Sequence, residues 1–277
     1  MEKSVPFLID HFGVVTPDNK GATSFLQTLG FVTGGGTPGA VESSESCHFM
    51  FDNCYLECDQ LSETGTISPL RIEVKGGPGV YFFIMSTRDV DKSRAAFIEA
   101  GFSPSEISRG FSRSADHGKI KGEAVFNAFY LNPVDSFSSM FVGAVCHVTK
   151  ELIYQKGRYV HENGVNKVSS LVLYYETPEK LEAAEKDISK LEGALRATAD
   201  PVCHMGNVRL VDKSAYESEF GVSVPTIKSV VAAAQFEDAD LAFLRKKAAS
   251  MGVPHFDKDG KLYIDARKET GLFLIFE

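Results

Sequence analysis

The sequence lacks several features that would indicate secretion or membrane insertion. It contains only five cysteines and no apolar run close to the roughly 20 residues of a membrane-spanning helix. No two cysteines form a CxxC pair, and an odd number in a chain of 277 residues predicts reduced thiols. The segment Met1–Asp10 lacks the basic and then apolar pattern of a signal peptide. We therefore expect a soluble cytoplasmic protein without a membrane partner.

The chain also lacks a cationic stripe. Its formal net charge is −8, and its lysines and arginines are scattered along the sequence. A phosphate backbone would find no concentrated positive surface, so nucleic acid is excluded as an expected partner. Hydrophobic residues make up 43% and charged residues 24%, which is typical of a globular protein with a sizeable core. A small molecule is the partner that this composition favours.

An internal repeat organises the first half of the chain. The segment Ile9–Phe31 aligns with Val80–Phe102, which lies 71 residues further along the chain. Each copy has an apolar run, an acidic residue (Asp18 or Asp89), a helical stretch and a closing Gly-Phe pair. This order predicts a buried strand, a helix with an acidic N-cap, and a glycine at the end of the helix.

Strand signals follow the first helix. Two short apolar segments, Cys47–Phe51 and Cys54–Cys58, are separated by Asp52-Asn53, a dipeptide typical of a two-residue hairpin turn. In that register His48 faces Glu57 on one side of the sheet, and Cys47 faces Cys58.

The second half repeats the order more faintly. Its expected elements are a strand at Val168–Tyr175, a helix at Pro178–Leu191 ended by Gly193, a strand at Thr226–Ala234, a helix at Ala239–Ser250 ended by Gly252, and strands at Lys261–Ala266 and Gly271–Glu277. The sequence thus predicts an α+β fold of four βαβββ modules. We expect one domain over residues 1–148, a linker over 149–166 and a second domain over 167–277.

These segments carry a family resemblance. It rests on five short stretches in a fixed order, namely Ile9-Asp10-His11, Leu29-Gly30-Phe31, Tyr55-Leu56-Glu57, Phe141–His147 and His161–Gly164. In this order the chain resembles the glyoxalase-like domain family of the vicinal oxygen chelate superfamily over most of its length. The resemblance implies that the modules pair into two curved-sheet barrels around clefts, where a divalent metal commonly sits. It also implies that His11 takes the family's first-strand ligand position and Glu57 its last-strand position.

The residue types agree with a metal site. Two imidazoles and a carboxylate, from His11, His48 and Glu57, suit Zn²⁺, Mn²⁺, Ni²⁺ or Fe²⁺. Such an ion would act as a Lewis acid on a substrate oxygen, and an unligated Glu57 would instead be the catalytic general base. Against this stands the plainer interpretation that a histidine on a strand is a hydrogen-bonded structural residue.

The chain departs from the family pattern in its other modules. The offset of 71 puts Phe82 at the place of His11, and the stretch Phe141–Ala144 has no carboxylate. His147 follows that stretch, and it either turns inward as a further metal ligand or caps the linker. In the second half the matching positions hold Val172, Val231 or Ala232, and Glu277. The third ligand is therefore left open, and an iron-dependent ring-cleaving site in the second half is disfavoured.

Arginines and phenylalanines are the remaining candidates for substrate binding. Arg109 and Arg113 could present a guanidinium to a carboxylate or phosphate, although a solvated strand edge is the plainer interpretation. Phe82 could contact substrate, and a set of aromatic rings could line an apolar pocket, namely Phe82, Phe126, Phe129 and Phe141.

Three functions fit this sequence. The first is a divalent-metal-dependent enzyme of lyase or isomerase type, or a dioxygenase, acting on a small oxygenated metabolite. The second is a small-molecule binding protein without chemistry, of the bleomycin-resistance type. The third is an interaction or subunit scaffold, and a homodimer is a candidate assembly in each case.

Overall fold

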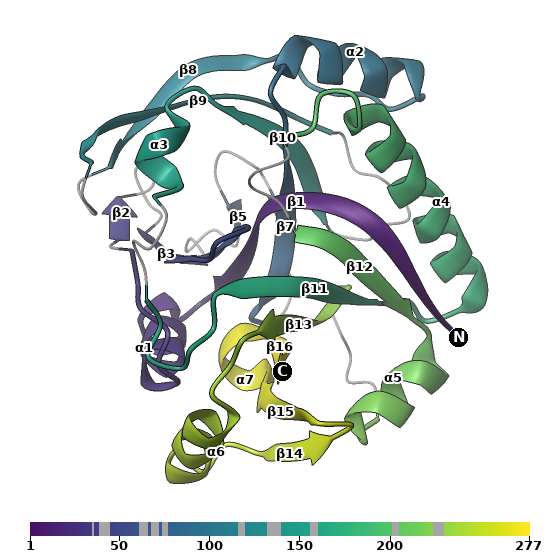
Figure 1. The fold of residues 1–277 in the computed structure, drawn as a ribbon. Helices are drawn as coiled ribbons and strands as arrows, with labels where there is room; N and C mark the ends of the chain where they lie inside the picture. The colour runs from purple at the N-terminus through teal and green to yellow at the C-terminus, as the bar shows by residue number, and fades with distance from the viewer. Residues whose placement is uncertain are drawn as a thin grey trace.

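A single curved sheet runs through the protein in the computed structural model (Figure 1). The structure describes residues 1–34, 36–38, 45–60, 66–67, 72–73, 77–115, 120–131, 140–155, 160–200, 205–223 and 230–277. Among these residues, 14 strands form the sheet and two more, β5 (Thr66–Ile67) and β6 (Ile72–Glu73), pair with each other. Helices cover the outside of the sheet, which gives the mixed α+β architecture that the sequence predicts.

The first half contains two βαβββ modules. Module one is β1 (Glu2–Thr16), α1 (Asn19–Thr28), β2 (Gly36–Pro38), β3 (Glu45–Met50) and β4 (Tyr55–Gln60). Module two is β7 (Gly79–Ser86), α2 (Val90–Glu99), β8 (Ser108–Ala115), β9 (Gly122–Tyr130) and β10 (Phe141–His147). In each module the last strand pairs parallel with the first, and β1 and β7 join the modules as antiparallel neighbours. We call this curved sheet the first barrel.

The second half follows the short helix α3 (Lys150–Ile153). Module three is β11 (Lys167–Tyr174), α4 (Pro178–Leu195), β12 (Met205–Val211) and α5 (Lys213–Phe220). Module four is β13 (Val231–Glu237), α6 (Leu241–Ser250), β14 (His255–Lys258), β15 (Lys261–Ala266), α7 (Arg267–Thr270) and β16 (Leu272–Phe276). The pairs β11–β12 and β13–β16 are parallel, as in the first half. We call this part of the sheet the second barrel.

Strand β1 belongs to both barrels. Its first residues, from Glu2 to Pro6, pair antiparallel with β12, whereas His11–Thr16 pairs parallel with β4. The third module therefore differs from the βαβββ order of the others, because α5 follows β12 and the next strand in the sheet comes from the N-terminus. Figure 1 shows β1 and β12 crossing the middle of the molecule between the two halves.

The repeat of the first half is confirmed in its details. Asp18 accepts a hydrogen bond from the backbone N–H of Gly21 at 2.9 Å, and Asp89 accepts one from that of Lys92 at 3.0 Å. Both aspartates are N-caps of their helices. The two closing glycines, at positions 30 and 101, have φ of 88° and 89°, a conformation that favours glycine.

The predicted hairpin is confirmed, and one predicted helix end is wrong. Strands β3 and β4 pair so that His48 faces Glu57 and Cys47 faces Cys58. Helix α4, by contrast, continues past Gly193 to Leu195. The apolar stripe of α4 extends into this last turn and stays buried, so packing outweighs the roughly 1 kcal/mol that a glycine costs inside a helix.

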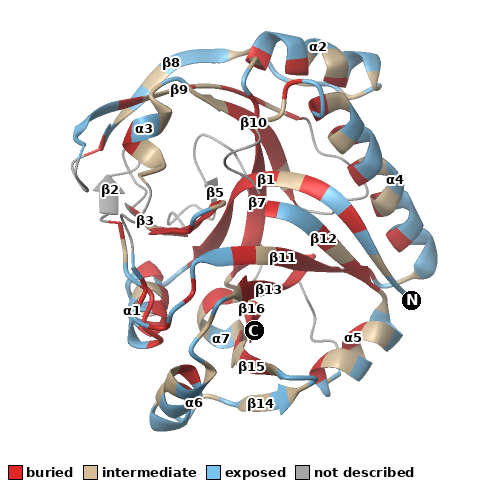
Figure 2. Ribbon diagram, in the orientation of Figure 1, coloured by how far each residue is buried: buried red, intermediate tan, exposed pale blue. Residues whose placement is uncertain are grey.

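Buried residues follow the strands through both halves (Figure 2). The largest cluster lies between the sheet and the helices, and each barrel adds a smaller cluster on its inner face. The inner cluster of the first barrel includes Phe82 and Phe126, and that of the second includes Tyr216 and Phe220 of α5. The inner faces are thus partly filled by aromatic rings from their own modules.

His161 connects the segment before β11 to the first module. Its Nδ1 accepts the backbone N–H of Val32 at 2.9 Å, and its Nε2 donates to the carbonyl of Met50 at 3.0 Å. The side chain is buried, and this burial lowers the pKa of His161 from 6.5 to about 4, against the opposing effect of the Met50 carbonyl. The imidazole is therefore neutral in the folded protein at neutral pH.

Stability is expected to fall between about pH 6.5 and pH 4 because of His161. The unfolded chain binds a proton at this histidine near pH 6.5, whereas the folded protein binds it only near pH 4. The contribution is complete above pH 6.5 and is lost as the pH falls, with an upper limit of about 3 kcal/mol. Urea unfolding across this range should show a shallower pH slope for His161→Gln than for the wild type. If stability falls with the same pH slope in both proteins, groups other than His161 cause the pH dependence.

Candidate functional site

A buried carboxylate joins two histidines on the inner side of the first barrel. Ile9 pairs with Met85 and His11 with Ile84, so Asp10 is the additional residue of a β-bulge in β1. The Asp10 Oδ1 lies 2.7 Å from Nδ1 of His11 and 3.0 Å from Nε2 of His147. The side chain of Asp10 is completely buried. Regular strand alternation would direct the Asp10 carboxylate to the opposite face from His11. The bulge instead brings it beside the His11 ring.

The two imidazoles keep Asp10 ionised. Burial alone would raise the pKa of Asp10, but His147 and His11 together hold that pKa well below its usual range. Because Asp10 is ionised, Nδ1 of His11 is the donor in their hydrogen bond, and Nε2 is the ring nitrogen left for another ligand. Nδ1 of His147 is buried and has no hydrogen-bond partner within the described structure.

A second pair lies on the neighbouring strands. His48 Nε2 and Glu57 Oε1 are 3.1 Å apart across the β3–β4 hairpin, and both side chains are nearly buried. Burial acts to raise the pKa of Glu57, but the hydrogen bond with His48, followed by electrostatic interactions with His48, His11 and Arg113, lowers that pKa to about 2. Glu57 is therefore a stable carboxylate at neutral pH.

Asp59 is a further acidic residue on the same face of β4 as Glu57. Burial, followed by the charge of Glu57, raises the pKa of Asp59 well above its usual value. The environment thus favours the ionised form of Glu57 and the protonated form of Asp59, although only one residue separates them. Asp59 was not among the residues predicted from the sequence, but its strand alternation with Glu57 was a signal that could have found it.

The two arginines proposed for substrate binding lie in different environments. The positive charge of Arg113 on β8 lowers the pKa of both Glu57 and Asp59. Its Nε is buried and makes no hydrogen bond to the described residues. Arg109 instead forms an ion pair of 2.5 Å with Asp91, and both of these side chains are more than half exposed. Arg113 is therefore the arginine that the fold brings to the carboxylates.

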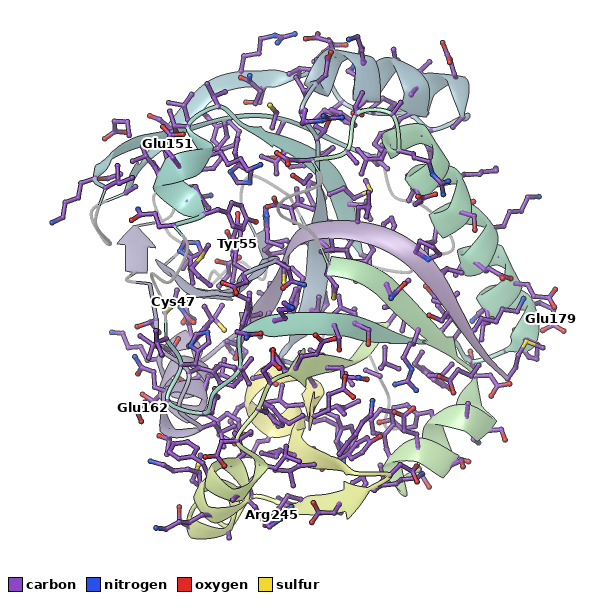
Figure 3. All side chains as sticks on the ribbon, viewed as in Figure 1. Cys47, Tyr55, Glu151, Glu162, Glu179 and Arg245 are labelled. Atoms are coloured by element: carbon purple, nitrogen blue, oxygen red, sulfur yellow. The ribbon has the colours of Figure 1, made fainter. Side chains whose placement is uncertain are left out.

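Aromatic rings pack against the histidines of both groups, the one joined by Asp10 and the His48–Glu57 pair. Tyr55 stacks on His11 with ring centroids 4.3 Å apart, and Tyr154 lies 6.1 Å from Tyr55 at the end of α3. In Figure 3, Tyr55 lies inside the arc of β8 and β9, below α3. Phe82 packs over Gly13, where an added Cβ would lie 1.8 Å from its ring, and its edge faces His11. The lack of a side chain at Gly13 thus makes room for the Phe82 ring.

The other predicted phenylalanines divide between two faces of the sheet. Phe126 packs edge-on against His147, and Phe141 packs against Tyr130. Phe129 packs against Phe97 of α2 in the main core and does not reach this group. Tyr154 was not predicted from the sequence, because its position depends on the path of the chain after β10.

The four predicted metal residues fall into two separate hydrogen-bonded groups. His11 and His147 meet at Asp10, while His48 meets Glu57. Within the described ranges, no group of three or more His, Cys, Asp or Glu side chains is arranged to hold a metal ion. In the second half, Glu277 accepts a hydrogen bond from Gln235 and forms an ion pair with Lys261.

The match to a family model decides the family. A model described as "Glyoxalase-like domain" matches residues 9–188 of this chain. The chain belongs to the glyoxalase-like domain family. This family is part of the vicinal oxygen chelate superfamily, as the resemblance of the sequence motifs implied. No curated protein matches the chain.

Solved structures of this superfamily share the fold of this glyoxalase-like protein. A mutant 4-hydroxymandelate synthase from Streptomyces coelicolor has a TM-score of 0.61 and 12% identity, over 98% of this chain and 92% of that chain. The Mn(II)-bound glyoxalase from Novosphingobium aromaticivorans has a TM-score of 0.53 and 10% identity, over 99% of this chain and 83% of that chain. A catechol 2,3-dioxygenase has a TM-score of 0.56 and 7% identity, over 97% and 92%. At these identities the likeness shows the fold alone.

No helix within the described part of this glyoxalase-like protein is long and apolar enough to cross a membrane.

Proposed function

We propose that the first barrel binds a small oxygenated metabolite and acts on it as a divalent-metal-dependent enzyme of lyase or isomerase type. One observation carries this proposal: the Asp10-bound His11 and the His48–Glu57 pair come from adjoining strands beside Arg113. Buried ionisable groups with shifted pKa values gather at functional sites more often than elsewhere. The solved glyoxalase named as Mn(II)-bound supports the choice of a divalent metal.

The donor chemistry of these residues fits such an ion. His11, His48 and Glu57 would hold it, because two imidazoles and one ionised carboxylate suit Zn²⁺, Mn²⁺, Ni²⁺ or Fe²⁺. His48 would exchange its hydrogen bond to Glu57 for the metal. Asp10 would be the outer carboxylate that fixes the ring of His11, and His147 would support Asp10 from the other side. The metal, when bound, supplies Lewis-acid polarisation of a substrate oxygen.

The remaining residues would bind and orient the substrate. Arg113 has a buried Nε without a hydrogen bond to the described residues, so a substrate carboxylate or enolate oxygen would be a suitable acceptor. The rings of Tyr55 and Phe82 would exclude water on either side of His11. Because its pKa is about 2, Glu57 is a weak proton acceptor at neutral pH and suits ligation better than general-base catalysis.

Metal binding is the test of this proposal. The purified protein should contain about one equivalent of divalent metal by elemental analysis, and apo-protein should take up Mn²⁺ or Zn²⁺ in a titration. His11→Ala and Glu57→Gln should each weaken this affinity at least about tenfold, because each removes a ligand. Glu277→Gln, a matched change in the second barrel, should leave the affinity unchanged. Negligible metal in all four proteins would refute the metal proposal.

A binding protein without chemistry is the second candidate. The observation that favours it is Phe82, which fills the space over Gly13 where a second module could have supplied a ligand. In this case small aromatic acids such as benzoate should raise the melting temperature equally with and without EDTA. Loss of that stabilisation in EDTA would favour the enzyme.

A further inference from the structure

The second barrel contains a polar cavity that is separate from the site of the first barrel. Its volume is about 670 Å³, and it is lined by β11, β12, β13, β15, α5 and the first residues of β1. This volume lies within the range of cavities that bind small metabolites. The rings of Tyr216 and Phe220 from α5 pack in the inner cluster of the same barrel. The shared strand β1 thus contributes Glu2 and Ser4 to this cavity and His11 to the other site.

Neutral polar side chains form one row along the wall of this cavity. Ser170 on β11 pairs in register with Asn207 on β12 and with Gln235 on β13. Ser170 is only 5% exposed, and its hydroxyl has no hydrogen-bond partner in the described structure. Gln235 is 7% exposed, and its Nε2 donates to Glu277. A buried hydroxyl without a partner is unfavourable unless another molecule bonds to it, which marks this row as a contact for a ligand.

Four of the six charged side chains that line the cavity, Glu2, Arg209, Glu219 and Lys261, are held in ion pairs. Arg209 donates to both carboxylate oxygens of Glu219, at 3.0 and 2.7 Å, and to Glu2 at 2.8 Å. Lys261 forms an ion pair of 2.7 Å with Glu277, and Lys258 donates to backbone carbonyls of α5. A charged ligand that approached these four side chains would have to break one of their ion pairs, whereas a neutral ligand could bond to their outer lone pairs and N–H groups.

We propose that this cavity is a second binding site, for a neutral polyhydroxylated molecule about the size of a monosaccharide. Hydroxyl groups both donate and accept, as the row of Ser170, Asn207 and Gln235 and the ion-paired carboxylates require. Tyr263, whose ring is stacked on Phe256, also lines the cavity, and its hydroxyl donates to Glu219 at 3.4 Å. This site does not depend on metal binding in the first barrel.

Calorimetric titration of the full chain tests the second site. The neutral probes are D-glucose and myo-inositol, and the charged probes of matched size are gluconate and glucosamine. At least one neutral probe should bind saturably at millimolar concentration or below, and the charged probes should bind at least about tenfold more weakly. Ser170→Ala should lower the affinity for the neutral probe about tenfold, since it removes one buried hydrogen bond to the ligand.

Two controls separate this result from a folding defect and from the first barrel. Ser170→Ala removes a hydroxyl without a partner, so its free energy of unfolding without ligand should equal or exceed that of the wild type. Glu57→Gln should leave the affinity for the neutral probe unchanged. The proposal is overturned if neither neutral probe binds, if the charged probes bind more tightly, or if Ser170→Ala binds like the wild type.

Discussion

Replacing Gly271 with alanine is expected to lower the free energy of unfolding by about 3–5 kcal/mol, one of the largest effects of any single methyl group in this protein. Gly271 ends α7 with φ of 76°, a conformation that is unfavourable for alanine. An added Cβ would also lie 2.2 Å from the carbonyl oxygen of Pro78 and 2.6 Å from Cα of Gly79. Both are backbone atoms, one just before β7 and one at its first residue, so the close contact cannot be relieved by a side-chain rotation.

Gly252→Ala is the matched control for this change. Gly252 has φ of 66° just after α6, but no atom lies within 4 Å of its ideal Cβ position. The alanine there should cost only about 1–2 kcal/mol, from backbone strain alone. Urea unfolding of both variants separates the two contributions. Equal losses would mean that the contact with Pro78 yields and that only the backbone conformation matters.

The position of Gly271 also connects the two halves energetically. The glycine belongs to module four, whereas Gly79 begins β7, the first strand of module two, and Pro78 directly precedes it. Together with the pairing of β1 and β12, this contact ties the barrels to each other. We therefore expect Gly271→Ala to shift a single unfolding transition and not to produce a separate one for the second half.

The parts of the fold that local chemistry decides were predictable from the sequence. The N-caps Asp18 and Asp89 and the Asp52-Asn53 turn each depend on neighbouring residues only. The turn also fixes the register that places His48 against Glu57. In contrast, the pairing of β1 with β12 joins segments about 200 residues apart, and no local pattern indicates it.

The same distinction explains what the sequence revealed about the candidate site. His11, Glu57 and His48 were found from the family motif and from the hairpin register. Asp10 was missed as a partner of His11, because strict strand alternation places neighbouring residues on opposite faces. Only the bulge, which depends on the antiparallel pairing of β1 with β7, turns its carboxylate toward the imidazole. Long-range pairing therefore creates the electrostatic environment of the site.

Asp10→Ala should destabilise the protein by about 3–5 kcal/mol at neutral pH. It removes a fully buried carboxylate and leaves His11 and His147 without their shared partner. The pKa of Asp10 is depressed in the folded protein, so its stabilising contribution is present above the unfolded value near 4 and is lost as the pH falls. Urea unfolding should thus show the largest difference from wild type at neutral pH and a smaller one in acid.

Asp10→Asn and His147→Gln separate the structural role of Asp10 from its role in orienting His11. Asparagine keeps the shape but loses the charge, so in the proposed metal site it should weaken Mn²⁺ or Zn²⁺ binding by about 10–100-fold. Glutamine at position 147 keeps a hydrogen-bond donor toward Asp10 and lies away from the His48–Glu57 pair. It should lower stability while leaving metal affinity within about threefold of wild type. If both variants lose metal affinity equally, Asp10 supports the fold of the site without specifically orienting His11.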